Sequence, residues 1–123
     1  MQTAIIVITA MFFLGMGVYA LAAPAALARL FRIVADTPES RSEIRAVYGG
    51  FGIAVAAVLT AAAVDAGGIR TGAVVTVGGA LAGMALGRLV SRLADRATPF
   101  YPIWFCFWVE TVTAALLFSS ATW

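Results

Sequence analysis

Four apolar segments, each long enough to cross a bilayer as a helix, follow one another along the chain. They cover about residues 3–23, 40–64, 71–92 and 101–120. About 20 consecutive apolar residues span the hydrocarbon core of a membrane as an α-helix. The pattern therefore predicts an all-α protein, an integral membrane four-helix bundle with four transmembrane helices, and residues 1–123 form a single domain.

Proline, glycine and capping residues mark the ends of these segments. The first segment stops near Pro24. The helix of the second segment begins either with Thr37 as its N-cap and Pro38 in its first position, or at the capping box 40–43. The sequence Asp65–Gly68 predicts a tight turn between the second and third segments.

The connection between the first two segments, at residues 25–34, is both apolar and basic. Its side chains include Leu27, Leu30, Phe31 and Ile33 together with Arg29 and Arg32. This mixture is typical of a helix that lies in the membrane interface, so we expect a short interfacial helix after the first span. No basic residue precedes Ile5, and the apolar run is longer than that of a signal peptide. We therefore expect the first segment to be a span.

Composition supports a membrane protein and argues against several chemistries. The chain is 63% hydrophobic and 11% charged, whereas soluble domains carry about 25% charged residues. Without histidine it lacks the commonest metal ligand and general base, and one cysteine, Cys106, cannot form an intramolecular disulfide. A net charge of +2 is too slight to suggest nucleic acid. We therefore expect no metal, no cofactor and no nucleic acid, and no residues stand out as catalytic.

The distribution of arginine predicts the orientation. All eight basic residues are arginines, and all but Arg70 fall in two groups. One group lies in the connection after the first segment and at the start of the second, and the other lies at the end of the third segment and in the connection after it. In a four-span protein these two connections lie on the same side, and arginine-rich connections stay in the cytoplasm. We therefore predict that both termini are periplasmic or extracellular.

Glu110 lies near the middle of the fourth segment, where a carboxylate costs about 2.5 kcal/mol or more unless it is paired or solvated. Arg45 and Arg88 lie at depths from which an extended arginine side chain can reach it, and Tyr48 is placed to donate a hydrogen bond. We predict a polar chamber of these four residues, open toward the cytoplasmic leaflet. The alternative is a purely structural ion pair that fixes helix register.

Other residues on the second and third segments are candidates for lipid contact and helix packing. Arg92 and Arg96 continue a ladder from Arg88 at every fourth position, and we expect them to extend outward to lipid head groups. Small residues let membrane helices approach closely, so we expect several glycines to pack helices within the bundle or between two copies. They are Gly49, Gly50, Gly52, Gly79, Gly83 and Gly87.

The run RSEIRAVYGG at residues 41–50 resembles the signature of a family of small bacterial four-span proteins classed as a domain of unknown function. That family is similar in architecture to DoxX-like membrane proteins. The resemblance covers nearly the whole chain and implies a four-helix bundle in a bacterial inner membrane. It also implies that the family's polar positions are filled here by Glu43, Arg45, Tyr48, Arg88 and Glu110. No activity follows, because the family has none assigned.

Two functions of different classes stay open. In the first, the chamber binds a small quinone-, isoprenoid- or lipid-like amphiphile, with arginine as the donor to anions or carbonyls. In the second, the protein is a non-catalytic accessory or scaffolding subunit of a larger membrane complex, or a homo-oligomer. A third reading, an isomerase with Glu110 as acid and base, lacks any feature that selects a substrate. A ligand-sized cavity around Glu110 favours the first function, and a filled interior favours the second.

Overall fold

The computed structural model describes residues 2–96 and 98–121, and these residues contain helices, short connections and no strand. Four helices are long and apolar enough to cross a membrane: Gln2–Ala22, Pro38–Ala63, Arg70–Ala94 and Phe100–Ser119. They overlap the four predicted segments, so the all-α prediction is confirmed for this part of the chain.

The first span is helix α1 (Gln2–Ala22), and a second, short helix, α2 (Pro24–Leu30), follows it at once. Pro24 occupies the first position of α2, where its missing N–H would have had no intrahelical partner. The segment expected as an interfacial helix thus starts slightly earlier than predicted and ends at Leu30. Beyond it Arg32 adopts a left-handed backbone conformation with φ of 59°.

The second span is a continuous helix built from α3 (Pro38–Ile44), a π-helical stretch at Arg45–Gly50 and α4 (Phe51–Ala63). The Thr37 hydroxyl accepts a hydrogen bond from the Ser40 backbone N–H at 3.0 Å, so Thr37 is the N-cap. The π-helical stretch coincides with the second half of the RSEIRAVYGG run. Such widened turns are rare and are frequent at functional sites.

The third and fourth spans are α5 (Arg70–Ala94) and the helix that ends in α6 (Phe105–Ser119), which a π-helical turn at Phe100–Trp104 precedes. The predicted turn before α5 places Asp65, Gly67 and Gly68 in the left-handed region, with φ of 51°, 62° and 72°. Glycine adopts this conformation at no steric cost, which explains why the chain reverses here.

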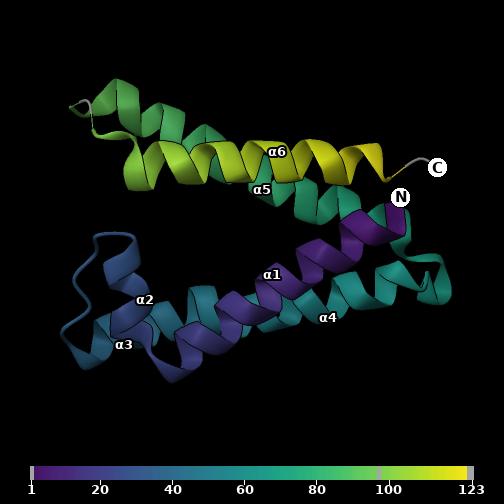
Figure 1. Ribbon diagram of the computed structural model, residues 1–123, viewed down its shortest axis with the longest axis horizontal. Coiled ribbons are helices and arrows are strands. Elements are labelled where there is room, and N and C mark those ends of the chain that lie inside the picture. The colour runs from purple at the N-terminus through teal and green to yellow at the C-terminus, as the bar shows by residue number, and fades with distance from the viewer. Residues whose placement is uncertain (1, 97, 122–123) are drawn as a thin grey trace.

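The spans are arranged as two helix pairs, α1 against α4 and α5 against α6 (Figure 1). The pairs meet near the two termini and diverge toward the end that holds α2 and α3. A core shared by all four spans fills the end near the termini, with Ile6, Leu59, Val74 and Leu117 fully buried. A separate small core joins α1, α2 and α3 at the other end.

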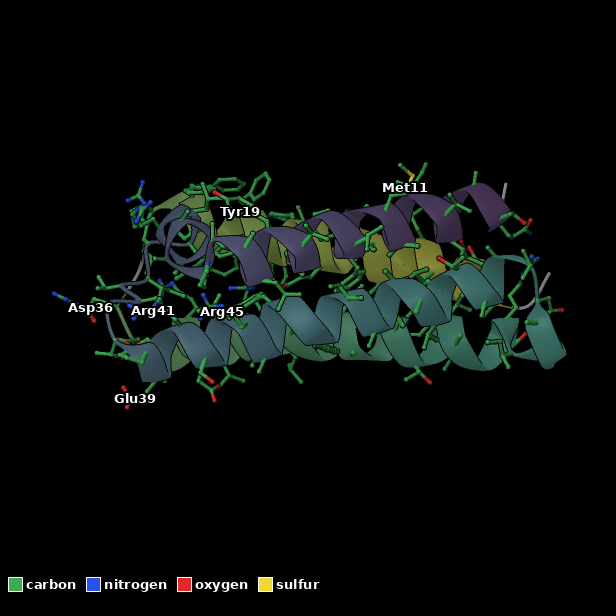
Figure 2. All side chains as sticks on the ribbon, turned by 90° about the horizontal axis from the view of Figure 1, so that it is seen from below. Met11, Tyr19, Asp36, Glu39, Arg41 and Arg45 are labelled. Atoms are coloured by element: carbon green, nitrogen blue, oxygen red, sulfur yellow. The ribbon has the colours of Figure 1, made fainter. Side chains whose placement is uncertain are left out.

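Charged side chains gather at the end where the pairs diverge. Figure 2 shows Asp36, Arg41 and Arg45 together there, far from the opposite end of α4. At that opposite end, Arg70 donates to the carbonyl oxygens of Ala62 and Ala63, at 3.1 and 2.7 Å. The two arginine-rich connections therefore lie at one end of the molecule and Arg70 lies at the other, as the arginine count requires.

Close packing between α1 and the second span depends on glycine. A Cβ atom at Gly17 would lie 2.8 Å from the Gly49 carbonyl oxygen, and one at Gly52 would lie 3.0 Å from the Phe13 carbonyl oxygen. Gly49 and Gly52 therefore lie where two helices pack closely, as expected. Gly50 is exposed and meets only its own helix, so no neighbouring helix packs on it.

The stripe formed by Gly79, Gly83 and Gly87 does not pack inside the protein. A Cβ atom at any of the three would meet no neighbouring atom within 4 Å. The prediction that this stripe packs against a helix of the same chain is therefore wrong, because α6 lies on another face of α5. The alternative, that the stripe contacts a second copy or another protein, stays a prediction.

Gly17→Ala should lower the free energy of unfolding by about 1–3 kcal/mol, because the added methyl group would press on backbone atoms that cannot move independently. Denaturation of the purified protein in detergent measures this change. Gly15→Ala is the matched control, since a Cβ atom there meets nothing within 4 Å. Equal stability of the two variants would contradict the close contact between α1 and the second span.

Candidate functional site

Glu110 and Arg88 form an ion pair between α6 and α5. Arg88 Nε donates to Glu110 Oε1 at 2.7 Å, and Arg88 Nη2 donates to Glu110 Oε2 at 2.8 Å. Both carboxylate oxygens are therefore bonded to one guanidinium in the forked geometry that makes arginine–carboxylate pairs strong. Of the two arginines considered for this carboxylate, Arg88 is the partner.

The pair lies in the contact between α5 and α6, where small side chains let the two helices approach. Ala85 on α5 and Cys106 and Ala114 on α6 are buried around it. The Glu110 side chain is 8% exposed, whereas that of Arg88 is 27% exposed. The carboxylate is thus enclosed, whereas the guanidinium is partly exposed toward the arginine-rich end of the molecule.

Arg45 lies outside this pair and has a different role. It is exposed, and its Nε donates to the Leu21 carbonyl oxygen at 3.3 Å. Leu21 is in the last turn of α1, where carbonyl groups lack intrahelical partners, and Pro24 has no N–H to offer them. Arg45 therefore caps α1 at the break before α2, and the prediction that it joins the Glu110 chamber is corrected.

Tyr48 and Glu43 are also outside the ion pair. Tyr48 stacks on Phe31, with ring centroids 5.9 Å apart and planes inclined by 19°. Its hydroxyl makes no hydrogen bond to Glu110 among the described residues. Glu43 is exposed on α3 and has no ion-pair partner in the described part of the chain. The buried polar network thus consists of Arg88 and Glu110.

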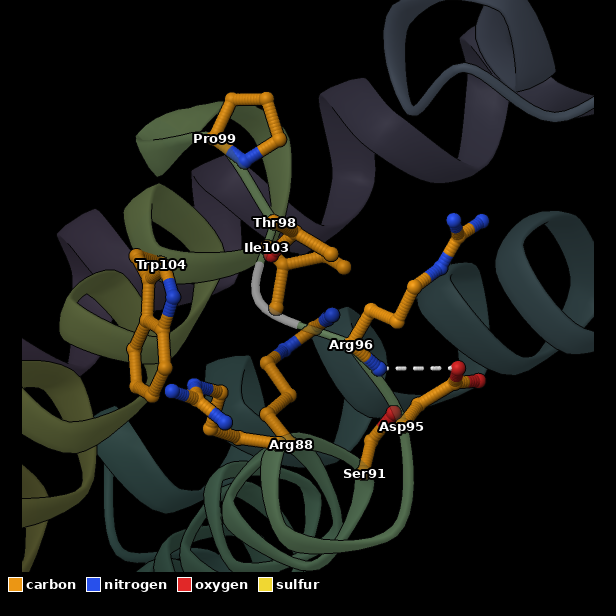
Figure 3. A pocket seen from close by; sticks show the side chains of 9 residues that line it. Arg88, Ser91, Asp95, Arg96, Thr98, Pro99, Ile103 and Trp104 are labelled. Atoms are coloured by element: carbon orange, nitrogen blue, oxygen red, sulfur yellow. Dashed lines mark hydrogen bonds between the residues drawn. The ribbon is translucent and has the colours of Figure 1, made fainter.

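A pocket opens next to Arg88 at the arginine-rich end of α5 and has a volume of about 340 Å³. We call it the arginine pocket. Arg88 and Trp104 lie toward one side of it, and Asp95 and Arg96 toward the other (Figure 3). Its lining consists of Arg88, Ser91, Arg92, Asp95, Arg96, Thr98, Pro99, Ile103 and Trp104.

A second hollow of about 330 Å³ continues from this pocket toward the middle of α5. We call it the Met84 hollow. Met84, Gly87 and Ile103 form the apolar part of its lining, and Arg88 and Ser91 form the polar part. Arg88, Ser91 and Ile103 line both spaces. The ligand-sized space is therefore beside Arg88 and does not reach Glu110, which lines neither one.

Most residues that line the arginine pocket were not predicted from the sequence. Ser91, Asp95, Thr98 and Ile103 carry no distinctive signal, because the pocket arises where the end of α5 turns back toward α6. Trp104 is brought to the pocket by the turn before α6. Prolines on both sides of Phe100 were the available signal that the backbone bends at this point.

Tyr101 connects the two diverging helix pairs beside the pocket. Its hydroxyl donates a hydrogen bond to the Leu30 carbonyl oxygen at the end of α2. The Arg32 guanidinium lies over the same ring, 5.8 Å from its centroid, a distance at which a cation is attracted to an aromatic face. This contact joins segments that lie 71 positions apart in the sequence.

The arrangement can bind an anion but offers little for acid–base chemistry. Both oxygens of Glu110 already accept hydrogen bonds, and the carboxylate does not face either open space. Arg88 uses one N–H each from Nε and Nη2, and its remaining donors make no hydrogen bond to the residues that the structure describes, so they can serve another acceptor. Arg92 and Arg96 add positive charge at the same pocket.

The fold and this site define a class: an all-helical protein with four helices suited to crossing a membrane and one buried ion pair between the last two. The chain belongs to the family described as Domain of unknown function (DUF4345), whose model matches residues 1–120. Comparison with curated proteins gave no match, and comparison with solved structures gave none either.

Glu110→Gln should lower the free energy of unfolding by about 3 kcal/mol, because it leaves the Arg88 charge without its buried partner. The double variant Glu110→Gln/Arg88→Gln should be more stable than Glu110→Gln alone. Denaturation in detergent gives the coupling energy. Arg45→Gln is the matched control, and its effect should add to that of Glu110→Gln. Coupling of Glu110 to Arg45, or none to Arg88, would contradict the observed pairing.

Proposed function

We propose that this protein binds a small amphiphile from one leaflet of the membrane, with its polar end in the arginine pocket. The observation that carries the proposal is the pocket itself, a space of about 340 Å³ that three arginines line beside a buried ion pair. Arginines that only anchor a helix end would need no such space. Arg88 forms the inner wall, and its ion pair with Glu110 holds the Arg88 donors in position.

The ligand classes that fit are quinone-, isoprenoid- and lipid-like molecules. Each has a polar group that arginine can recognise, either a carbonyl or an anion, and an apolar part that can stay in the bilayer. The resemblance to DoxX-like membrane proteins, which are associated with quinone-linked redox systems, supports including quinones. Lipids of the membrane are the natural competitors for the same pocket.

A second candidate function is that of an accessory subunit in a larger membrane complex or a homo-oligomer. The observation that favours it is the stripe of Gly79 and Gly83, where an added Cβ atom would meet no atom of the described residues within 4 Å. Stripes of this kind allow close approach of another membrane helix. In this alternative the Arg88–Glu110 pair serves only to fix α5 against α6.

Native mass spectrometry of the protein in mild detergent tests the first function against the second. We expect the wild type to retain a small amphiphile and Glu110→Gln/Arg88→Gln to lose it while staying folded, because the pocket loses its inner donors. Arg45→Gln, which leaves the pocket intact, should retain the molecule. If the double variant retains the same small molecules, the ion pair is structural and the accessory-subunit function takes precedence.

We further propose that the protein lies in a bacterial inner membrane with both termini outside the cytoplasm. The gathering of seven arginines at one end of the molecule supports this orientation, because arginine-rich connections are retained in the cytoplasm. The arginine pocket then opens to the cytoplasmic leaflet.

Thiol labelling in intact cells tests the orientation. With Cys106 replaced by alanine, Ala66→Cys in the turn before α5 should react with a membrane-impermeant reagent. Asp36→Cys, between α2 and α3, should react only after the membrane is permeabilised. Both positions are exposed, so a difference reports the side of the membrane. The reverse labelling pattern would overturn the orientation.

A further inference from the structure

The arginine pocket and the Met84 hollow form one continuous surface with a polar end and an apolar end. The polar end holds three arginines and Asp95, and the apolar end holds Met84, Gly87 and Ile103. Since Met84 and Gly87 precede Arg88 along α5, the apolar end points toward the middle of the span. This is the layout of an amphiphile whose head faces the membrane surface and whose chain runs along the bilayer.

The charge of the polar end favours an oxyanion. Glu110 neutralises Arg88, and Asp95 offsets one of Arg92 and Arg96, so three arginines against two carboxylates leave one net positive charge. Asp95 also accepts a hydrogen bond from the backbone N–H of Arg96 at 2.9 Å, which keeps it at the rim. A neutral head group would leave this positive charge without a partner.

The spacing of the donors favours phosphate over carboxylate. A carboxylate has two oxygens, and one guanidinium satisfies both of them, as Arg88 does with Glu110. Arg88 and Arg92 lie one helical turn apart on α5, whereas Arg96 follows the end of that helix at Ala94. The three guanidinium groups therefore reach the pocket from different parts of the backbone. A tetrahedral phosphate offers more oxygens to such a set and can bind several guanidinium groups together.

The apolar end has room for a hydrocarbon chain over Gly87, which has no side chain. A Cβ atom there would meet nothing within 4 Å, so the surface of α5 is open at this point. Met84 and Ile103 form the remaining apolar lining. Met84 is unbranched and flexible, which lets it adapt to an irregular chain.

We infer that the ligand is a phosphate-bearing amphiphile, whose phosphate contacts Arg88, Arg92 and Arg96 and whose hydrocarbon chain lies over Gly87. The inference rests on the proposed binding function and names its ligand class. It also gives Gly87 a different role from Gly79 and Gly83: Gly87 keeps the path from the pocket to the bilayer open.

The test uses the full-length protein in an uncharged detergent and three probes: decyl phosphate, decanol and inorganic phosphate. Native mass spectrometry and a binding titration measure each. We expect one decyl phosphate per chain, bound at least about tenfold more tightly than either other probe, because only it uses both ends of the surface. Arg92→Gln should weaken decyl phosphate binding by about tenfold or more, since it removes a charge-assisted donor.

Two matched controls separate this site from general attraction to anions and from general effects on the fold. Arg41→Gln removes an arginine at the same end of the molecule but outside the pocket, and should leave binding within about twofold of the wild type. Gly87→Leu should block decyl phosphate. Gly72→Leu, on α5 and also in open space, should not affect it.

Three results would overturn the inference, and each has a different consequence. Equal binding of inorganic phosphate and decyl phosphate, unaffected by Gly87→Leu, means an anion site without a chain path. Equal binding of decanol, unaffected by Arg92→Gln, rejects the phosphate but leaves amphiphile binding in place. If no probe binds and the wild type retains no amphiphile from its own membrane, both the inference and the proposed function fail.

Discussion

A carboxylate in the middle of an apolar helix must have a partner, and the pairing of Glu110 with Arg88 meets this requirement. Both oxygens are bonded at 2.7 and 2.8 Å, and the carboxylate is buried between α5 and α6. Isolated, it would cost several kcal/mol in an apolar interior. The pair therefore joins α6 to α5, and it also places Arg88 at the inner wall of the arginine pocket.

The remaining architecture leaves that pocket open. The shared core holds the four spans together near the termini, and the glycine contacts at Gly17 and Gly52 hold α1 on α4. At the arginine-rich end the two pairs diverge, and the contact of Tyr101 with Leu30 is a polar link between them. Arg45 contributes to this end by capping α1, and neither Arg45 nor Arg41, the two arginines of the RSEIRAVYGG run, lines the pocket.

Much of the fold follows from the sequence, whereas the site follows only in part. Apolar length fixed the spans, and Thr37, Pro24 and the turn at 65–68 marked boundaries through local chemistry. The cost of burying Glu110 predicted a partner, and depth reduced the choice to Arg45 or Arg88. Depth alone does not determine which helix lies beside α6, so Tyr48 and Arg45 were wrongly placed in the chamber. The expectation that the stripe at Gly79 and Gly83 packs within the bundle was wrong for the same reason, because spacing defines a face but not its neighbour.

The most direct test of this account is a solid-state NMR measurement on the protein in lipid bilayers, with arginine labelled with ¹⁵N and glutamate with ¹³C. The account predicts that arginine nitrogens dephase one glutamate side-chain carboxyl signal strongly, and that this signal disappears in Glu110→Gln. Dephasing should also be lost in Arg88→Gln and kept in Arg45→Gln. A Glu110 carboxyl signal with no arginine nitrogen close to it would contradict the pairing on which the site and the packing of α6 depend.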